Sequence, residues 1–222
     1  MANAFLYRIG FAFFYFFLLF ITSIFILFNI LNVQIGIIPF LIGLIFVIIV
    51  YYQFTKLSND FIESYFWIIV IANIIIILIL SFCQPLWEDD WARYLWEGYL
   101  ISKNISPYTI SPDYFFGKNF IAINTESTLE ILSRVNHPDW PAIYFPLIES
   151  YFYFCSLLAP ISLTMIKIFY LIFDLIVLAI IRHLRGSKMA LLFFSFPLIL
   201  KEIYLNGHFE MIPIFFLTLS IY

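Results

Sequence analysis

Charged side chains are scarce in this chain: Asp, Glu, Lys and Arg make up only 11% of its 222 residues, while 64% of the residues are hydrophobic. A soluble domain carries roughly 25% charged residues, so this composition excludes an ordinary soluble domain. The net charge of −3 leaves no basic stripe to neutralise phosphates, which argues against nucleic acid as a partner. With 29 Phe and 15 Tyr, apolar side chains must face lipid as well as a protein core.

Cysteine and the common short catalytic motifs are also nearly absent. The two cysteines, Cys83 and Cys155, lie in apolar segments, which favours small buried hydrophobes over a disulfide. No CxxC, HExxH or P-loop pattern occurs. The N-terminal apolar run, from about Phe11 to Leu31, exceeds the roughly 7–15 residues of a signal-peptide core. We therefore expect it to remain as a membrane helix.

Long apolar runs fill most of the chain. A helix needs about 20 apolar residues to cross the bilayer core, and three runs come first: one within "FLYRIGFAFFYFFLLFITSIFILF", then "IGIIPFLIGLIFVIIVYY" and "YFWIIVIANIIIILILSF". Apolar sequence resumes in "AIYFPLIESYFYFCSLLAP" and "LTMIKIFYLIFDLIVLAIIRHL", and a shorter run breaks at "KEIYLNGHFE". We predict an all-α polytopic membrane protein with three spans in 1–83, an extracytoplasmic loop carrying short interfacial helices in 84–140, and further helices with a broken segment in 141–222. The final apolar run is too short to span, so we also expect a C-terminally truncated piece of a larger membrane protein.

The segment 84–140 differs in composition from the rest of the chain. It holds most of the acidic residues and turn-forming stretches such as "NISPYTISPDYFFGKN", and its aromatic content is too high for disorder. Because it is poor in Lys and Arg, the positive-inside rule places it outside. Two full spans after it would then put Arg182, Arg185 and Lys188 outside as well. Either one segment between Ala142 and Leu184 does not cross, or the orientation is reversed.

The densest charge lies in "QPLWEDDWARYLWEGYL", which begins with three adjacent acids, Glu88, Asp89 and Asp90. Like charges this close repel, which favours a raised pKa at one of them and a role as general base. On a helix, one polar stripe would contain Asp90, Arg93, Tyr94 and Glu97, and a second face would contain Trp87, Trp91 and Leu95. Such a helix would lie along the membrane surface with its charges toward water. A merely solvated polar face is the alternative to a catalytic one.

Three further polar stretches follow. Asn104 and Tyr108 lie in "NISPYTISP", where an ordered loop is the simpler reading, and Asn136, His137 and Tyr144 lie in "NHPDWPAIYFPLIES", where a histidine beside proline is typical of a turn. The last stretch interrupts an apolar region with Lys201, Glu202, Asn206, His208 and Glu210. Polar groups at membrane depth are costly and mark sites or cavities, and Pro197 and Gly207 suggest a broken helix. Acids with His137 or His208 could bind a divalent ion, but no spacing is diagnostic, so we predict no metal and no cofactor.

These four stretches, in this order, resemble the GT-C superfamily of membrane glycosyltransferases, and in particular bacterial polyprenyl-phosphate-dependent mannosyltransferases, which are similar to the first GPI mannosyltransferase. Family patterns look like "DD..RY.WDG", "G.NPY...P", "NHP..P.IYPP" and "NPL...E...NGH.D". Glu97 and Glu210 stand where Asp is more common, Ser106 interrupts the second pattern and Phe145 replaces a proline of the third. The resemblance runs from about Glu88 to Glu210. Family members carry several more membrane helices after the last pattern.

The resemblance implies a GT-C-like fold and an enzyme, a hexosyltransferase and specifically a mannosyltransferase, in the bacterial inner membrane. It would move the sugar from a polyprenyl-phosphate donor to a lipid-linked or cell-surface glycan acceptor, among membrane lipids. Asp89 or Asp90, with Glu88, would take the proton of the acceptor hydroxyl, while Arg93 or Lys201 would stabilise the departing phosphate. The other polar residues named above would bind substrate.

Two other functions remain open. Broken helices with buried polar groups also suit a secondary transporter, although no internal repeat occurs and most polarity lies in one loop. A non-catalytic scaffold, an inactive fragment, is the third possibility.

Overall fold

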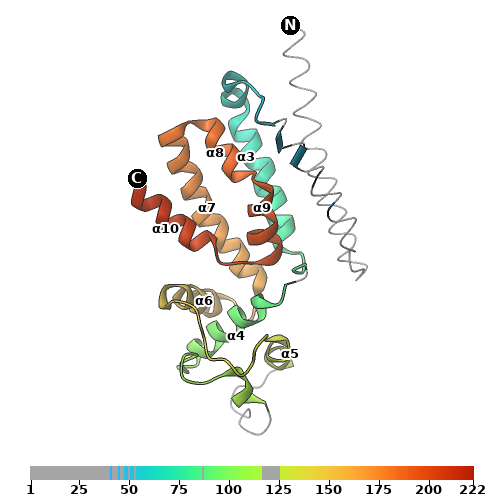
Figure 1. Ribbon diagram of the computed structural model, residues 1–222, viewed down its shortest axis with the longest axis vertical. Coiled ribbons are helices and arrows are strands. Elements are labelled where there is room, and N and C mark those ends of the chain that lie inside the picture. The colour runs from blue at the N-terminus through green and yellow to red at the C-terminus, as the bar shows by residue number, and fades with distance from the viewer. Residues whose placement is uncertain are drawn as a thin grey trace.

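The computed structural model describes residues 41, 45, 48–49, 51–52, 54–86, 88–116 and 126–222. The predicted first span, most of the second span and Trp87 lie outside these residues. Within the described ranges every regular element is helical. The described helices form a bundle above a second group of helices (Figure 1).

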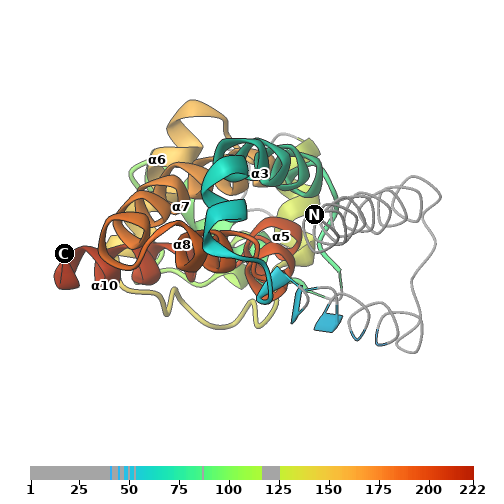
Figure 2. The same ribbon diagram turned by 90° about the horizontal axis from the view of Figure 1, so that it is seen from above.

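We call the following helices the bundle: α3 (Asn59–Ser81), α7 (Leu163–Arg185), α8 (Ser187–Phe194), α9 (Pro197–Ile199), the π-helix η3 (Leu200–Asn206) and α10 (Met211–Ile221). Ser58 and Ser162 cap the N-termini of α3 and α7 by accepting hydrogen bonds from backbone N–H groups at 3.3 Å, as serine commonly does. α3 exposes an apolar stripe of Trp67, Ile71 and Ile75, which suits contact with lipid. Seen from above, α3, α7 and α8 group together and α10 extends to one side (Figure 2).

Within the part of the chain that the structure describes, three segments are long and apolar enough to cross a membrane: Asn59–Ser81, Leu163–Arg185 and Ser187–Asn206. The third is interrupted, as predicted. α8 ends at Phe194, α9 (Pro197–Ile199) restarts the helix at a proline, and the π-helix η3 (Leu200–Asn206) follows. Gly207, at φ +88°, ends it in the left-handed region that glycine tolerates.

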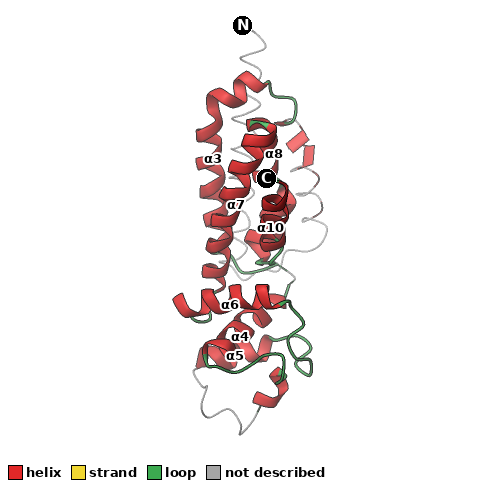
Figure 3. Ribbon diagram, turned by 90° about the vertical axis from the view of Figure 1, so that its left-hand side faces the viewer, coloured by secondary structure: helices red, strands yellow, loops and turns green. Residues whose placement is uncertain are grey.

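The short helices α4 (Asp90–Ser102), the 3₁₀-helix η1 (Pro112–Phe115), α5 (Glu126–Arg134) and α6 (Pro146–Leu158) form the loop module, described over residues 88–116 and 126–158. α6 has only 13 residues and runs across the end of the bundle against α4 (Figure 3). A helix of that length rises about 20 Å, less than the bilayer core. The segment "AIYFPLIESYFYFCSLLAP" therefore forms a helix shorter than a membrane span, and α7 is the first helix after the loop module that is long enough to cross.

This arrangement brings the basic residues to the end of the bundle opposite the loop module. Lys188 Nζ donates to the Leu57 carbonyl at 2.8 Å, and Arg182 lies 3.5 Å from the Glu63 carboxylate. The start of α3 therefore lies beside the end of α7 and the start of α8. Of the two alternatives, a segment that does not cross fits this arrangement and would remove the conflict in charge distribution that two full spans create.

The helix α4 does not lie on a surface with its charges toward water. All residues from Trp91 to Leu100 are buried, including Arg93, Tyr94 and Glu97, each 2% exposed or less. The prediction of a solvated polar stripe is wrong for these three side chains, because α5 and α6 pack against the helix and the segment after α5 covers its polar side. Only Asp90 keeps partial exposure.

Candidate functional site

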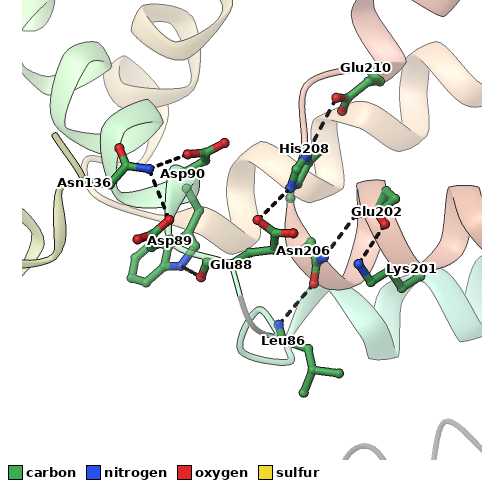
Figure 4. Close-up of polar contacts among 12 residues, drawn as sticks. Leu86, Glu88, Asp89, Asp90, Asn136, Lys201, Glu202, Asn206, His208 and Glu210 are labelled. Carbon is green, nitrogen blue, oxygen red and sulfur yellow. Dashed lines mark hydrogen bonds and ion pairs between the residues drawn. The ribbon is translucent and has the colours of Figure 1, made fainter. Parts of the chain in front are cut away.

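The three acids lie where the bundle meets the loop module. Asp89 is exposed and Asp90 half-buried at the start of α4. The Asn136 side-chain amide, from the segment after α5, donates to Asp89 Oδ1 at 3.1 Å and to Asp90 Oδ1 at 2.5 Å (Figure 4). One amide thus holds both carboxylates near each other, and it brings the first and third polar stretches together.

Glu88 faces the bundle instead. Its carboxylate lies 3.4 Å from His208 Nε2, and Glu210 lies 3.6 Å from His208 Nδ1 on the other side of the ring (Figure 4). The interaction with Glu210 is the main cause that raises the pKa of His208 to about 9; Glu88 and Glu202 add to it, and partial burial opposes it. His208 is therefore a cation at neutral pH.

The π-helix supplies the remaining polar groups on the bundle side. Lys201 Nζ lies 2.7 Å from Glu202 Oε1, and Asn206 Nδ2 donates to Glu202 Oε2 at 3.2 Å. Asn206 Oδ1 accepts from the Leu86 N–H at 3.1 Å, which ties the π-helix to the chain just before the acids. π-helical turns are rare and frequently occur at functional sites.

The second and third stretches meet at Tyr108 and Tyr144. Tyr108 Oη donates to the Tyr144 carbonyl at 2.8 Å, and the ring of Tyr144 packs on Phe209 at 5.2 Å between centroids. Asn104, at φ +59°, is a turn residue. With Tyr108 and Glu149 it lines a cavity of about 400 Å³ beside α6. Tyr94 is buried. Its ring stacks on that of Phe152 at 4.7 Å between centroids and also packs against the ring of Tyr144.

Arg93 does not face a substrate. Its Nε donates to Glu97 Oε1 at 3.1 Å, Nη1 to the carbonyls of Asn136 and His137, and Nη2 to those of Trp140 and Pro141, all within 3.1 Å. The guanidinium has five N–H donors, so these contacts use them all. Arg93 and Glu97 instead fix the segment that carries Asn136. His137 is the turn element of that segment: its φ is +43° and its exposed ring stacks on Trp140.

Three buried acidic or basic residues among those described were not found from the sequence: Glu149, Lys167 and Asp174, and Asp174 accepts a hydrogen bond from Tyr204 at 2.7 Å. Glu149 on α6 is 2% exposed; burial, and then the charge of Glu97, raises its pKa to about 10, so that it is neutral. Lys167 on α7 donates to the carbonyls of Cys83 at 2.9 Å and Leu205 at 2.7 Å, and so joins the ends of α3 and the π-helix. Glu149 carries no local signal, whereas a lone lysine in an apolar span could have been noted as costly.

The described residues contain one group of three side chains that could hold a metal ion, Glu88, Glu202 and His208. Residues from all four polar stretches lie near the boundary between the bundle and the loop module. No family model, curated protein or solved structure matches this chain.

Proposed function

We propose that this chain is a membrane glycosyltransferase of the GT-C type, which moves a hexose, most simply mannose, from a polyprenyl-phosphate donor to a glycan or glycolipid acceptor. The observation that carries the proposal is the convergence of four polar stretches, far apart in sequence, at one end of a bundle of membrane-length helices. A lipid phosphate and a water-soluble sugar meet at such a boundary, which suits transfer better than transport.

The residues divide into two groups that suit the two halves of the reaction. Asp89 and Asp90, held by Asn136, would take the proton of the acceptor hydroxyl. Lys201 on the bundle side would stabilise the negative charge on the departing lipid phosphate. The sugar bond to phosphate breaks as the acceptor oxygen bonds to the sugar, with inversion.

The proposal also includes an orientation. The basic residues Arg182, Arg185 and Lys188 lie at the bundle end opposite the loop module. With these on the cytoplasmic side, the acids face the outside, where cell-envelope glycans are assembled.

The test is transfer in membranes with radiolabelled polyprenyl-phosphate mannose, glucose and arabinose, for Asp89→Asn, Asp90→Asn and the double variant. Loss of the general base should lower the rate by about 10²–10⁴-fold. Glu130→Gln is the matched control, because Glu130 is an exposed acid on α5 paired with Arg134, and it should transfer normally. Normal transfer in both single variants and the double variant contradicts the assignment of the base. A wild-type protein that consumes none of the three donors contradicts the function.

A further inference from the structure

Three side chains from separate segments bring potential metal-binding atoms together beside the acids. Glu88 precedes α4, Glu202 lies in the π-helix and His208 follows it, and one ligand atom from each lies within 4.8 Å of the other two. Figure 4 shows Glu88 and His208 pointing toward each other, with Glu202 on the same side of the junction. No pattern of spacing in the sequence relates these positions.

The distance between Glu88 and His208 suits a shared ion better than a hydrogen bond. Nε2 of His208 is buried and, within the described part of the chain, has no hydrogen-bond partner; Glu88 Oε2 lies 3.4 Å away. Two ligands held roughly 2.1 Å from one zinc ion at the tetrahedral angle lie about 3.4 Å apart. Glu202 would close on the ion by a small side-chain rotation.

The surrounding residues orient these groups as outer-shell partners do in metal sites. Glu210 faces Nδ1 of His208 at 3.6 Å, and a carboxylate on the second ring nitrogen is the usual partner of a metal-bound histidine. Asn206 donates to Glu202 Oε2, and Lys201 contacts Oε1. A carboxylate has about four lone-pair positions, so Glu202 retains capacity for a metal bond.

The charge at the junction favours a cation. Five carboxylates, those of Glu88, Asp89, Asp90, Glu202 and Glu210, lie along it with two lysines, Lys201 and the buried Lys167.

We propose that Glu88, Glu202 and His208 bind a divalent transition-metal ion of the Zn²⁺ or Mn²⁺ class. One imidazole and two carboxylates suit these ions, whereas Mg²⁺ prefers oxygen ligands and water. The binding itself does not depend on the reaction. If the proposed transfer is correct, the ion lies on the side of the junction where the donor phosphate departs, and adds positive charge there.

The experiment is titration of the whole purified chain in detergent with Mn²⁺, followed by loss of the free-ion EPR signal. We expect one Mn²⁺ per chain, displaced by a lower concentration of Zn²⁺ than of Mg²⁺. Glu88→Gln, Glu202→Gln and His208→Asn should each weaken Mn²⁺ binding by at least tenfold. Glu210→Gln should weaken it by about 10–100-fold through its effect on His208.

Glu130→Gln removes an equal charge from α5 and should bind Mn²⁺ as the wild type does. Glu88 is partly exposed, so Glu88→Gln should not disturb the fold. It therefore tests the site even if His208→Asn unfolds at a lower temperature than the wild type. Wild-type binding in both Glu88→Gln and His208→Asn overturns the proposal, as does the absence of Mn²⁺ binding by the wild type at millimolar concentrations. Mn²⁺ binding without any transfer leaves the metal site standing and overturns only the enzymatic function.

Discussion

At the scale of single residues, Arg93 shows how a polar group can be part of a site without touching a substrate. Its guanidinium contacts four carbonyls between Asn136 and Pro141 and the carboxylate of Glu97. Those carbonyls belong to the segment whose Asn136 amide holds Asp89 and Asp90. Burial of the arginine is tolerated because every donor has an acceptor. Its role is to position the acids.

Arg93→Lys should therefore destabilise the protein, although the charge is kept. A lysine offers three donors from one atom and cannot match the planar fork, so several part-buried carbonyls lose their partner, at a cost of about 1–3 kcal/mol. Arg134→Lys is the matched control: its pair with Glu130 is exposed on both sides and should contribute less than about 1 kcal/mol. Thermal unfolding in detergent measures both. Equal melting temperatures for the two variants would contradict the positioning role.

At the scale of helices, the loop module depends on a close approach between α4 and α6. Gly98 lies inside α4, where glycine is about 1 kcal/mol less favourable than alanine. A Cβ atom at this position would lie 2.5 Å from the Phe152 carbonyl oxygen of α6. One turn earlier, Tyr94 stacks on the Phe152 ring. A residue without a Cβ atom is therefore needed at position 98 for α6 to pack this closely against α4.

Gly98→Ala should accordingly destabilise the protein despite the better helix propensity of alanine. The clash is with backbone, which cannot rotate away, so the helices must separate, at a cost of about 1–3 kcal/mol. Ser150→Ala on the exposed side of α6 is the control and should change stability by about 0.5 kcal/mol or less. A Gly98→Ala protein as stable as the Ser150→Ala protein would show that α4 and α6 do not approach this closely.

At the scale of the whole molecule, the decisive feature is that α6 is shorter than a membrane span and lies across the end of the bundle. The loop module and the basic turn between α7 and α8 then lie at opposite ends of the bundle. Acids and cations of the candidate site gather at one end, and the positive charges that set orientation gather at the other.

Single cysteines should reveal this arrangement. In a background with the buried Cys83 and Cys155 replaced by Ser, Asp113→Cys in η1 and Arg185→Cys at the end of α7 are both at exposed positions. A membrane-impermeant maleimide should label Cys at 113 in intact cells and Cys at 185 only after permeabilisation. Labelling of both from the same side would mean that α6, or another segment, crosses after all.

Much of the architecture follows from local sequence. The spans α3 and α7 and the break before Pro197 are predictable, because hydrophobic length and helix-breaking residues act within a single segment. The candidate site is less predictable. The four polar stretches of the sequence indicate Asn136, Asn206 and His208 as site residues. Nothing in the local sequence distinguishes Asp89, which is exposed, from Glu97, which is buried.

The sequence by itself determined that this chain is helical and built for a membrane, and it marked the four polar stretches. Only the tertiary structure decided which polar groups are buried, which face one another and where α6 lies. Burial of Glu97 and Glu149, and the approach of His208 to Glu88, depend on contacts between segments far apart in the chain. Such contacts produce no periodic pattern in the sequence, because they depend on how distant segments pack in space and not on the spacing of residues along the chain.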